Sequence, residues 1–270
     1  MLFFLHIPKT AGSTLNYIIK NNFRDKAQEI RWHWTTWIDR EELIQKLKKV
    51  DLKGKSLIHG HFVFGFHELV NPEETKYLTF VREPLKKVIS GFYHIKRDKK
   101  SQFHDVYKSK DIVDYLLDQN ILENDNGLVR RLSGIGDQVP YGKIEPQHLE
   151  LAIRNINNYF LAVGITEKFD LSIELFKHLG IISKKYYWKQ NEASNKKKEG
   201  ISIPDETLKA FKELNKHDFQ LYAYCLNWFN KETEKIRFSQ SEFNFKNRLY
   251  NISLIPNKIV KKISNTIRQR

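Results

Sequence analysis

A lysine and a run of small or hydroxyl-bearing residues stand near the start of the chain, in FLHIPKTAGST at residues 4–14. A loop of this kind, between a buried strand and a helix, exposes several N–H groups at the positive end of the helix dipole. Lys9 adds a positive charge. The residues that would approach the ligand are Lys9, Thr10, Ala11, Gly12, Ser13 and Thr14. The stretch predicts a phosphate cradle, although a hydroxyl at 13 or 14 could instead serve only as a helix N-cap.

A second cation follows another strand. The run YLTFV ends in Arg82, and Ser90 lies about two turns into the helix that follows. In an ATP-binding P-loop the lysine follows the second glycine, and a neighbouring strand ends in a magnesium-binding aspartate. Here Lys9 precedes Gly12, and Arg82 stands where that aspartate would be. Because a guanidinium repels a metal ion and binds phosphate, we expect a ligand with two separated anionic groups and no metal.

Histidines provide candidates for a general base. The stretch HGHF at 59–62 follows a predicted strand, which places His61 at the edge where open α/β sheets bind ligands. An imidazole has a pKa near neutrality, which suits the removal of a proton from a hydroxyl. His59 is a candidate for contacting substrate, and His67 and Glu68 are competing bases. The ten histidines show no metal-ligand spacing, so no metal site is predicted.

Strand and helix patterns alternate around these residues. Apolar runs predict strands at 2–7, 76–81 and 159–165, and SLIHGHFVFG at 56–65 predicts a strand that runs into a loop. Helical spacing follows the runs at 2–7, 76–81 and 159–165 and covers 204–235. This order predicts a P-loop-like, three-layer α/β fold with a central, mostly parallel sheet flanked by helices.

The domain organisation follows from the same patterns. We expect one α/β domain over residues 1–235, with a mainly helical insertion at 99–157. The basic tail at 236–270 is expected to dock on the domain, to lie on a membrane surface or to be partly disordered.

Composition limits the partners and the compartment. The 270 residues carry a net charge of +14, which indicates an anionic partner or the lysine-rich surface common in proteins of AT-rich genomes. The single cysteine, Cys225, excludes an intrachain disulfide and favours a reducing compartment. No run approaches the roughly 20 apolar residues of a spanning helix, so we expect no transmembrane segment and a cytoplasmic location.

Two motifs together resemble a known family. HIPKTAGST, followed by TFVREPLKKVISGFYH, is similar to the two nucleotide-binding motifs of sulfotransferases that use 3′-phosphoadenosine 5′-phosphosulfate (PAPS). The carbohydrate branch, with the heparan sulfate and uronyl 2-O-sulfotransferases, is the most similar. HGHF, DNGLVRRLSG at 125–134 and FLAVGITEKFDLSIELF at 160–176 resemble further blocks of that branch.

The resemblance implies an activity and a role for each residue. The chain would be a PAPS-dependent O-sulfotransferase acting on a carbohydrate hydroxyl, for example of an anionic polysaccharide or glycolipid. The residues at 9–14 would hold the 5′-phosphosulfate, and Arg82 and Ser90 the 3′-phosphate. His61 would be the catalytic base, and Lys9 the electrostatic partner of the leaving oxygen. Arg130 matches the arginine of the DNGLVRRLSG block and is a candidate for binding the acceptor or for a structural ion pair.

Two other functions are weighed against this one. A P-loop-like, ATP-dependent kinase would need the lysine and magnesium ligand that this loop lacks. A non-catalytic protein that binds nucleic acid or another anion would fit the charge, but the sequence has no helix-turn-helix, RNA-recognition or zinc signature. We therefore expect no nucleic-acid partner.

Overall fold

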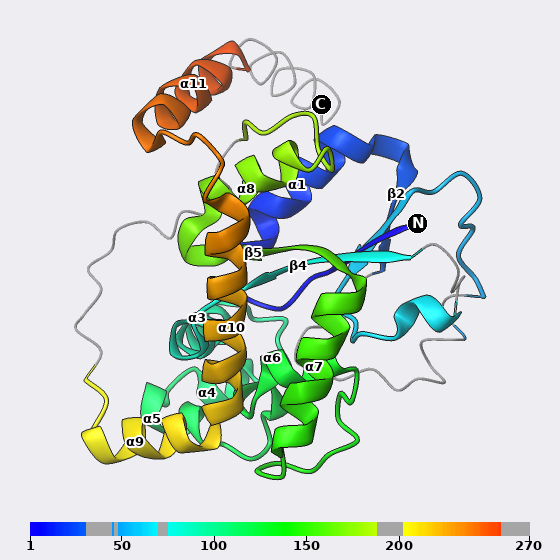
Figure 1. The fold of residues 1–270 in the computed structure, drawn as a ribbon. Coiled ribbons are helices and arrows are strands. Elements are labelled where there is room, and N and C mark those ends of the chain that lie inside the picture. The colour runs from blue at the N-terminus through cyan, green and yellow to red at the C-terminus, as the bar shows by residue number, and fades with distance from the viewer. Residues whose placement is uncertain (31–44, 46–47, 70–74, 188–201, 255–270) are drawn as a thin grey trace, which may run out of the picture.

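The computed structural model describes residues 1–30, 45, 48–69, 75–187 and 202–254. Within these residues a five-stranded sheet has the order β2-β3-β1-β4-β5 (Figure 1). The strands are β1 (Leu2–Leu5), β2 (Ala27–Ile30), β3 (Leu57–Gly60), β4 (Lys76–Val81) and β5 (Phe160–Ile165). Every neighbouring pair is parallel, so all five carboxyl ends lie at one edge of the sheet. This confirms the predicted P-loop-like α/β fold.

Helices connect and cover the strands. The α-helices are α1 (Gly12–Phe23), α3 (Pro84–Arg97), α4 (His104–Tyr107), α5 (Ile112–Leu116), α6 (Gly127–Ser133), α7 (Pro146–Tyr159), α8 (Phe169–His178), α9 (Asp205–Leu214), α10 (Lys216–Thr233) and α11 (Gln240–Ser253). Short 3₁₀ turns include η2 (Phe66–Leu69) and η3 (Leu122–Asn124). Figure 1 shows α1 and α8 on one side of the sheet and α6 and α7 on the other, with α10 running past β5.

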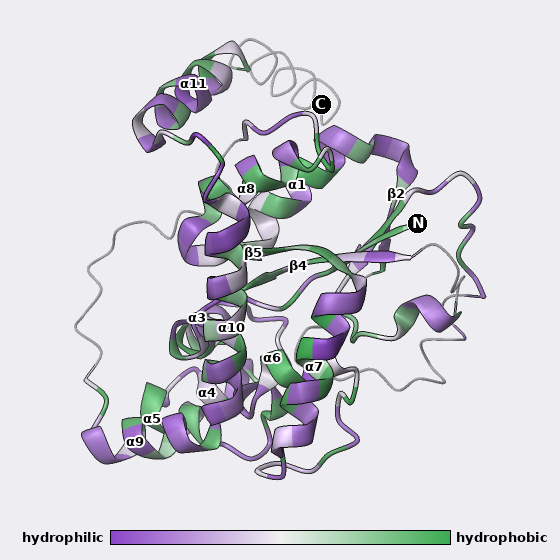
Figure 2. Ribbon diagram, viewed as in Figure 1, coloured by the Kyte–Doolittle hydropathy of each residue, from purple (hydrophilic) through white to green (hydrophobic). Residues whose placement is uncertain are grey.

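One face of the sheet packs against α1 and α8. Side chains alternate along a strand, so the even-numbered residues of β1 and β4 face the same side. Phe4 and Leu78 lie there against Leu15 and Ile18 of α1 and Ile173 of α8, and all five are buried. Continuous apolar strands of this kind are typical of a parallel sheet covered on both faces. Figure 2 shows the same apolar colouring along the central strands.

The opposite face packs against an aromatic cluster. Phe3 and Tyr77 stack with ring centroids 5.2 Å apart, and Tyr77 stacks on Phe160 at the same distance. The rings of Phe62 and Phe66, from the segment after β3, lie against Phe3. These rings fix the chain that leaves β3 and therefore fix the position of the residues just beyond it.

Two elements differ from the sequence prediction. The edge strand β2 was not predicted, because its residues AQEI contain only one buried apolar side chain. The predicted helix at 204–235 is two helices, since Asn215 interrupts it between α9 and α10. In the tail, α11 packs against α8, its Phe243 is buried beside Tyr186 and Tyr187, and residues 255–270 lie outside the described part of the chain.

Candidate active site

The loop after β1 has an unusual backbone. Lys9 and Ala11 have φ angles of 67° and 65°, in the left-handed region that costs a residue with a side chain about 1–2 kcal/mol. Thr10 stabilises the turn, because its fully buried hydroxyl donates a hydrogen bond of 2.7 Å to the carbonyl of Ile7. The side chain of Thr10, predicted to contact the ligand, therefore holds the loop in shape.

Helix α1 starts directly at this loop. Its first helical residue is Gly12, and its first turn contains no acidic side chain that would repel an anion. The carbonyl of Ala11 accepts hydrogen bonds from the N–H groups of Thr14 and Leu15, which closes the first turn. Ser13 is exposed and Thr14 is half-buried. The positive end of the α1 dipole thus points to the bend of the loop, as an anion site requires.

Gly12 leaves room for the imidazole ring of His6, which lies where a side chain at position 12 would start. A Cβ atom at Gly12 would lie 2.0 Å from Cε1 and 2.1 Å from Nε2 of His6. The His6 ring is buried, and it also stacks on His61 with centroids 4.3 Å apart. Nε2 of His6 is buried without a hydrogen-bond partner in the described part of the structure. His6, which the sequence analysis did not place among the site residues, therefore links the start of α1 to the candidate base.

His61 is held in one tautomer. Its Nδ1 lies 2.8 Å from the carbonyl oxygen of His6. A carbonyl oxygen can only accept, so Nδ1 must carry the proton and Nε2 must carry the lone pair. Burial lowers the pKa of His61 to about 4, and the positive charge of Arg131 acts in the same direction. The imidazole is therefore neutral at pH 7, and Nε2 can accept a proton.

Arg82 joins the end of β4 to the loop after β1. Its Nη1 donates a 3.0 Å hydrogen bond to the carbonyl of Lys9, and its Nε lies 3.9 Å from Oε1 of Glu167. The hydroxyl of Tyr222 donates to the other carboxylate oxygen of Glu167 at 3.1 Å. Glu167 and Tyr222 are not among the predicted site residues. Glu167 lies two residues after the end of β5, and no feature of the sequence connects it with Arg82.

Lys9 lies in a cationic environment. Burial, together with the nearby charges of Arg97 and Arg82, lowers the pKa of its ammonium group to about 8. Burial also lowers the pKa of Arg82. Cations crowded in this way repel one another, and an anion placed between them relieves the repulsion. Ser90 lies half-buried in α3, two turns beyond the N-cap Glu83.

The competing bases lie elsewhere. The hydroxyl of Tyr77 accepts a hydrogen bond from the backbone N–H of His67 and lies 2.8 Å from Nδ1 of the same residue. Tyr77 is near the amino end of β4, about 13 Å of strand away from Val81. The structure therefore does not place His67 with Arg82. Glu68 is exposed in η2 beside His67.

His59 is buried inside β3. Its side chain is 3% exposed, and burial lowers its pKa, while Glu29 of β2 acts in the opposite direction. A side chain so enclosed belongs to the interior of the protein and does not face a substrate, although it lies only two residues before His61. The structure brings His61, Lys9 and Arg82 to the same edge and leaves His59 within the strand.

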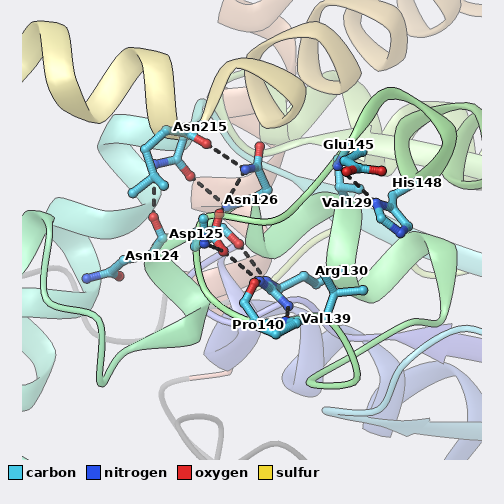
Figure 3. Close-up of polar contacts among 12 residues, drawn as sticks. Asn124, Asp125, Asn126, Val129, Arg130, Val139, Pro140, Glu145, His148 and Asn215 are labelled. Atoms are coloured by element: carbon cyan, nitrogen blue, oxygen red, sulfur yellow. Dashed lines mark hydrogen bonds and ion pairs between the residues drawn. The ribbon is translucent and has the colours of Figure 1, made fainter.

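Arg130 is enclosed by protein acceptors (Figure 3). Its Nη2 lies 2.5 Å from Asp125, and its remaining N–H groups reach the carbonyls of Asp125, Gly136, Val139 and Pro140. These bonds use all five donors of the guanidinium, and the side chain is fully buried. This geometry favours the structural ion pair over acceptor binding for Arg130.

A second buried charge cluster lies next to it. Glu123 accepts from Nη2 of Arg131 at 2.8 Å and lies 2.9 Å from Nζ of Lys87. Although burial would raise the pKa of Glu123, the two cations lower it. A Cβ at Gly127 would lie 2.8 Å from Nζ of Lys87, so the cluster also requires that glycine. Arg131, the second arginine of DNGLVRRLSG, is held by this cluster, and its positive charge lowers the pKa of His61.

The cluster is anchored by α10. Asp218 accepts hydrogen bonds from the N–H groups of Leu128 and Val129, and Asn126 donates to the carbonyl of Leu214 and accepts from the N–H of Asp218. Burial raises the pKa of Asp218 to about 6. These partners are some 90 residues apart in the chain, so no local motif could have indicated them.

Comparison of the sequence with models of known protein families finds one matching family. The model of the sulfotransferase family matches residues 1–225 of this chain. A search of curated proteins finds no match. The matched range contains the loop after β1, the end of β3, the end of β4 and the α6 segment. In the part of the chain that the structure describes, no group of three or more His, Cys, Asp or Glu side chains could hold a metal ion.

Proposed function

This chain belongs to the sulfotransferase family, and we propose that it transfers a sulfuryl group from PAPS to a hydroxyl of a carbohydrate. The observation that carries the proposal is the fixed tautomer of His61: a neutral imidazole whose Nδ1 is 2.8 Å from a carbonyl, beside an anion-binding loop. A base of this kind suits the deprotonation of a hydroxyl.

The donor is inferred from two cationic positions. The start of α1 and Lys9 suit the 5′-phosphosulfate, and Arg82 with Ser90 suits the 3′-phosphate. Lys9 and Arg82 follow the neighbouring strands β1 and β4, and Nη1 of Arg82 donates a hydrogen bond to the carbonyl of Lys9. A nucleotide that carries anionic groups on both sides of its ribose matches this arrangement better than ATP does.

The transfer step needs one base and one electrostatic partner. Nε2 of His61 takes the proton of the acceptor hydroxyl as the new bond between that oxygen and sulfur forms. Lys9 stabilises the negative charge on the bridging oxygen as its bond to sulfur breaks, and adenosine 3′,5′-bisphosphate leaves. Because the ammonium of Lys9 is a point charge on a flexible stem, it can follow that oxygen during the reaction.

The acceptor class is supported by sequence similarity alone. The blocks HGHF and DNGLVRRLSG resemble those of the carbohydrate branch of the family. The test is a transfer assay with labelled PAPS against a panel of glycosaminoglycans, bacterial polysaccharides, phenols and peptides. Labelling of a glycan that is lost in His61→Asn supports the proposal, and labelling of only phenols or peptides contradicts it.

Donor binding has its own test. Adenosine 3′,5′-bisphosphate is expected to raise the melting temperature without magnesium, and much more than AMP does, since AMP lacks the 3′-phosphate. The difference between the melting-temperature shifts of the two nucleotides should largely disappear in Arg82→Gln, which keeps a polar side chain but shortens it and removes its charge. Equal shifts in the wild-type protein would refute the assignment of Arg82.

A further inference from the structure

Helix α11 has an interior face. Phe243 is buried against the body of the protein, and the hydroxyls of Tyr250 and Tyr17 lie 3.1 Å apart. Asn247 and Asn251 bond the backbone of Tyr187 on both sides, at 2.8 Å and 3.1 Å. With 100° of rotation per residue, these four α11 residues lie on one side of the helix. That side fixes α11 to the segment after α8.

The opposite face of α11 is apolar and exposed. Phe245, Leu249 and Ile252 are 63%, 50% and 53% exposed, and they are spaced i, i+4 and i+7. This spacing places them in one stripe, turned by about 180° from Phe243. The other exposed large apolar residues of the described structure are scattered over different elements: Tyr93, Val106, Leu161 and Leu179. Figures 1 and 2 show α11 at the periphery, with green segments among purple ones.

Basic residues flank this stripe. Lys246 and Arg248 are exposed and lie on either side of it, about 60–100° away around the helix, and Lys246 forms an ion pair with Glu242 of the same helix. Residues 236–270 contain eight basic residues and one acidic residue, so this eighth of the chain carries half of the net charge of +14. An apolar stripe between basic flanks is the pattern of a helix that lies in the headgroup region of an anionic bilayer.

We propose that α11 docks the protein on a bilayer rich in anionic phospholipid, with Phe245, Leu249 and Ile252 inserted and the basic residues among the headgroups. A second copy of the chain would place equal positive charge against this surface, so charge complementarity favours the lipid. No helix in the described part of the chain is long and apolar enough to span a bilayer, so the contact is peripheral.

The experiment is flotation of the full chain with vesicles of neutral phosphatidylcholine, with and without 30 mol% phosphatidylserine. The wild-type protein should float only with the anionic vesicles. The triple variant Phe245→Ser/Leu249→Ser/Ile252→Ser should lose at least about tenfold in partitioning, because the apolar anchor is removed. Arg248→Gln should lose about fivefold, the contribution of one basic residue near an anionic surface.

Control variants distinguish a bilayer from other partners that could cover the apolar stripe of α11. Val106→Ser/Leu179→Ser changes exposed apolar residues elsewhere and should bind like the wild-type protein. Unchanged binding by the triple variant would overturn the role of the stripe, and equal binding to neutral vesicles would overturn the role of charge. A dimer that the triple variant dissociates, without vesicle binding, would assign the stripe to a second copy. Vesicle binding that appears only after removal of residues 255–270 would assign it to that segment.

Discussion

Replacing His61 by asparagine tests whether the base is held neutral by the fold. The amide nitrogen of asparagine occupies nearly the position of Nδ1, so it can still donate to the carbonyl of His6, while the basic Nε2 is lost. In the folded wild-type protein the pKa of His61 is about 4, against 6.5 in the unfolded chain. The unfolded state therefore takes up more protons as the pH falls, and acid destabilises the folded state.

The size of this effect follows from the two pKa values. Between pH 8 and pH 5 the unfolded histidine becomes almost fully protonated, whereas the folded one stays mostly neutral. The linkage relation then gives a loss of about 2 kcal/mol in the free energy of unfolding that is due to His61. The loss is absent above the unfolded pKa and complete below the folded one. His61→Asn should lack it, so its free energy of unfolding should fall by about 2 kcal/mol less than that of the wild-type protein.

Urea unfolding at pH 8, 7, 6 and 5 measures the difference between the two proteins, which cancels the titration of the remaining groups. His178→Asn changes an exposed ring at the end of α8 and should follow the wild-type protein. Transfer activity should fall by about 10²–10⁴-fold in His61→Asn while adenosine 3′,5′-bisphosphate still binds. Equal losses of stability in wild-type protein and His61→Asn would refute the neutral, enclosed imidazole.

Three further changes test other parts of the site. Gly12→Ala should cost about 1–3 kcal/mol of stability by thermal unfolding and lower activity, because the new methyl group meets the His6 ring; a variant as stable and active as the wild-type protein would contradict this contact. Glu123→Gln should cost about 3–5 kcal/mol in urea unfolding, since it leaves two buried cations without their carboxylate; a loss below 1 kcal/mol would mean that the cluster is solvated. The kcat/KM for transfer should decline above about pH 8 as Lys9 loses its proton, and a flat profile to pH 9.5 would remove Lys9 from the reaction.

The sequence predicted what depends on local pattern. A buried strand that ends at a small-residue loop and a helix is a contiguous signal, and so is the arginine that follows β4. Because parallel strands present their carboxyl ends at one edge, placing Lys9, His61 and Arg82 there required only the strand assignments. The edge strand β2 lacked such a signal, since an edge needs few apolar residues.

Long-range contacts were beyond sequence reasoning. Arg130 and Arg131 are adjacent in DNGLVRRLSG, and only the fold distinguishes them: one is enclosed by the segment 136–140, and the other faces Glu123 near His61. Glu167 reaches Arg82 because β5 lies beside β4. The stacking of His6 on His61 likewise depends on β1 and β3 being neighbours, although 55 residues separate the two rings.

The capping of α6 by Asp218 has a consequence for synthesis on the ribosome. The five strands of the described sheet and the residues 9–14, 61, 82 and 131 are translated before α10, whose first residue is Lys216. Yet the N–H groups at the start of α6 find their carboxylate only when α10 has emerged. A nascent chain that has already formed its sheet therefore still lacks the support of the segment beside His61. The proposed catalytic centre therefore gains this support only after α10 has left the exit tunnel, later than every strand of the described sheet.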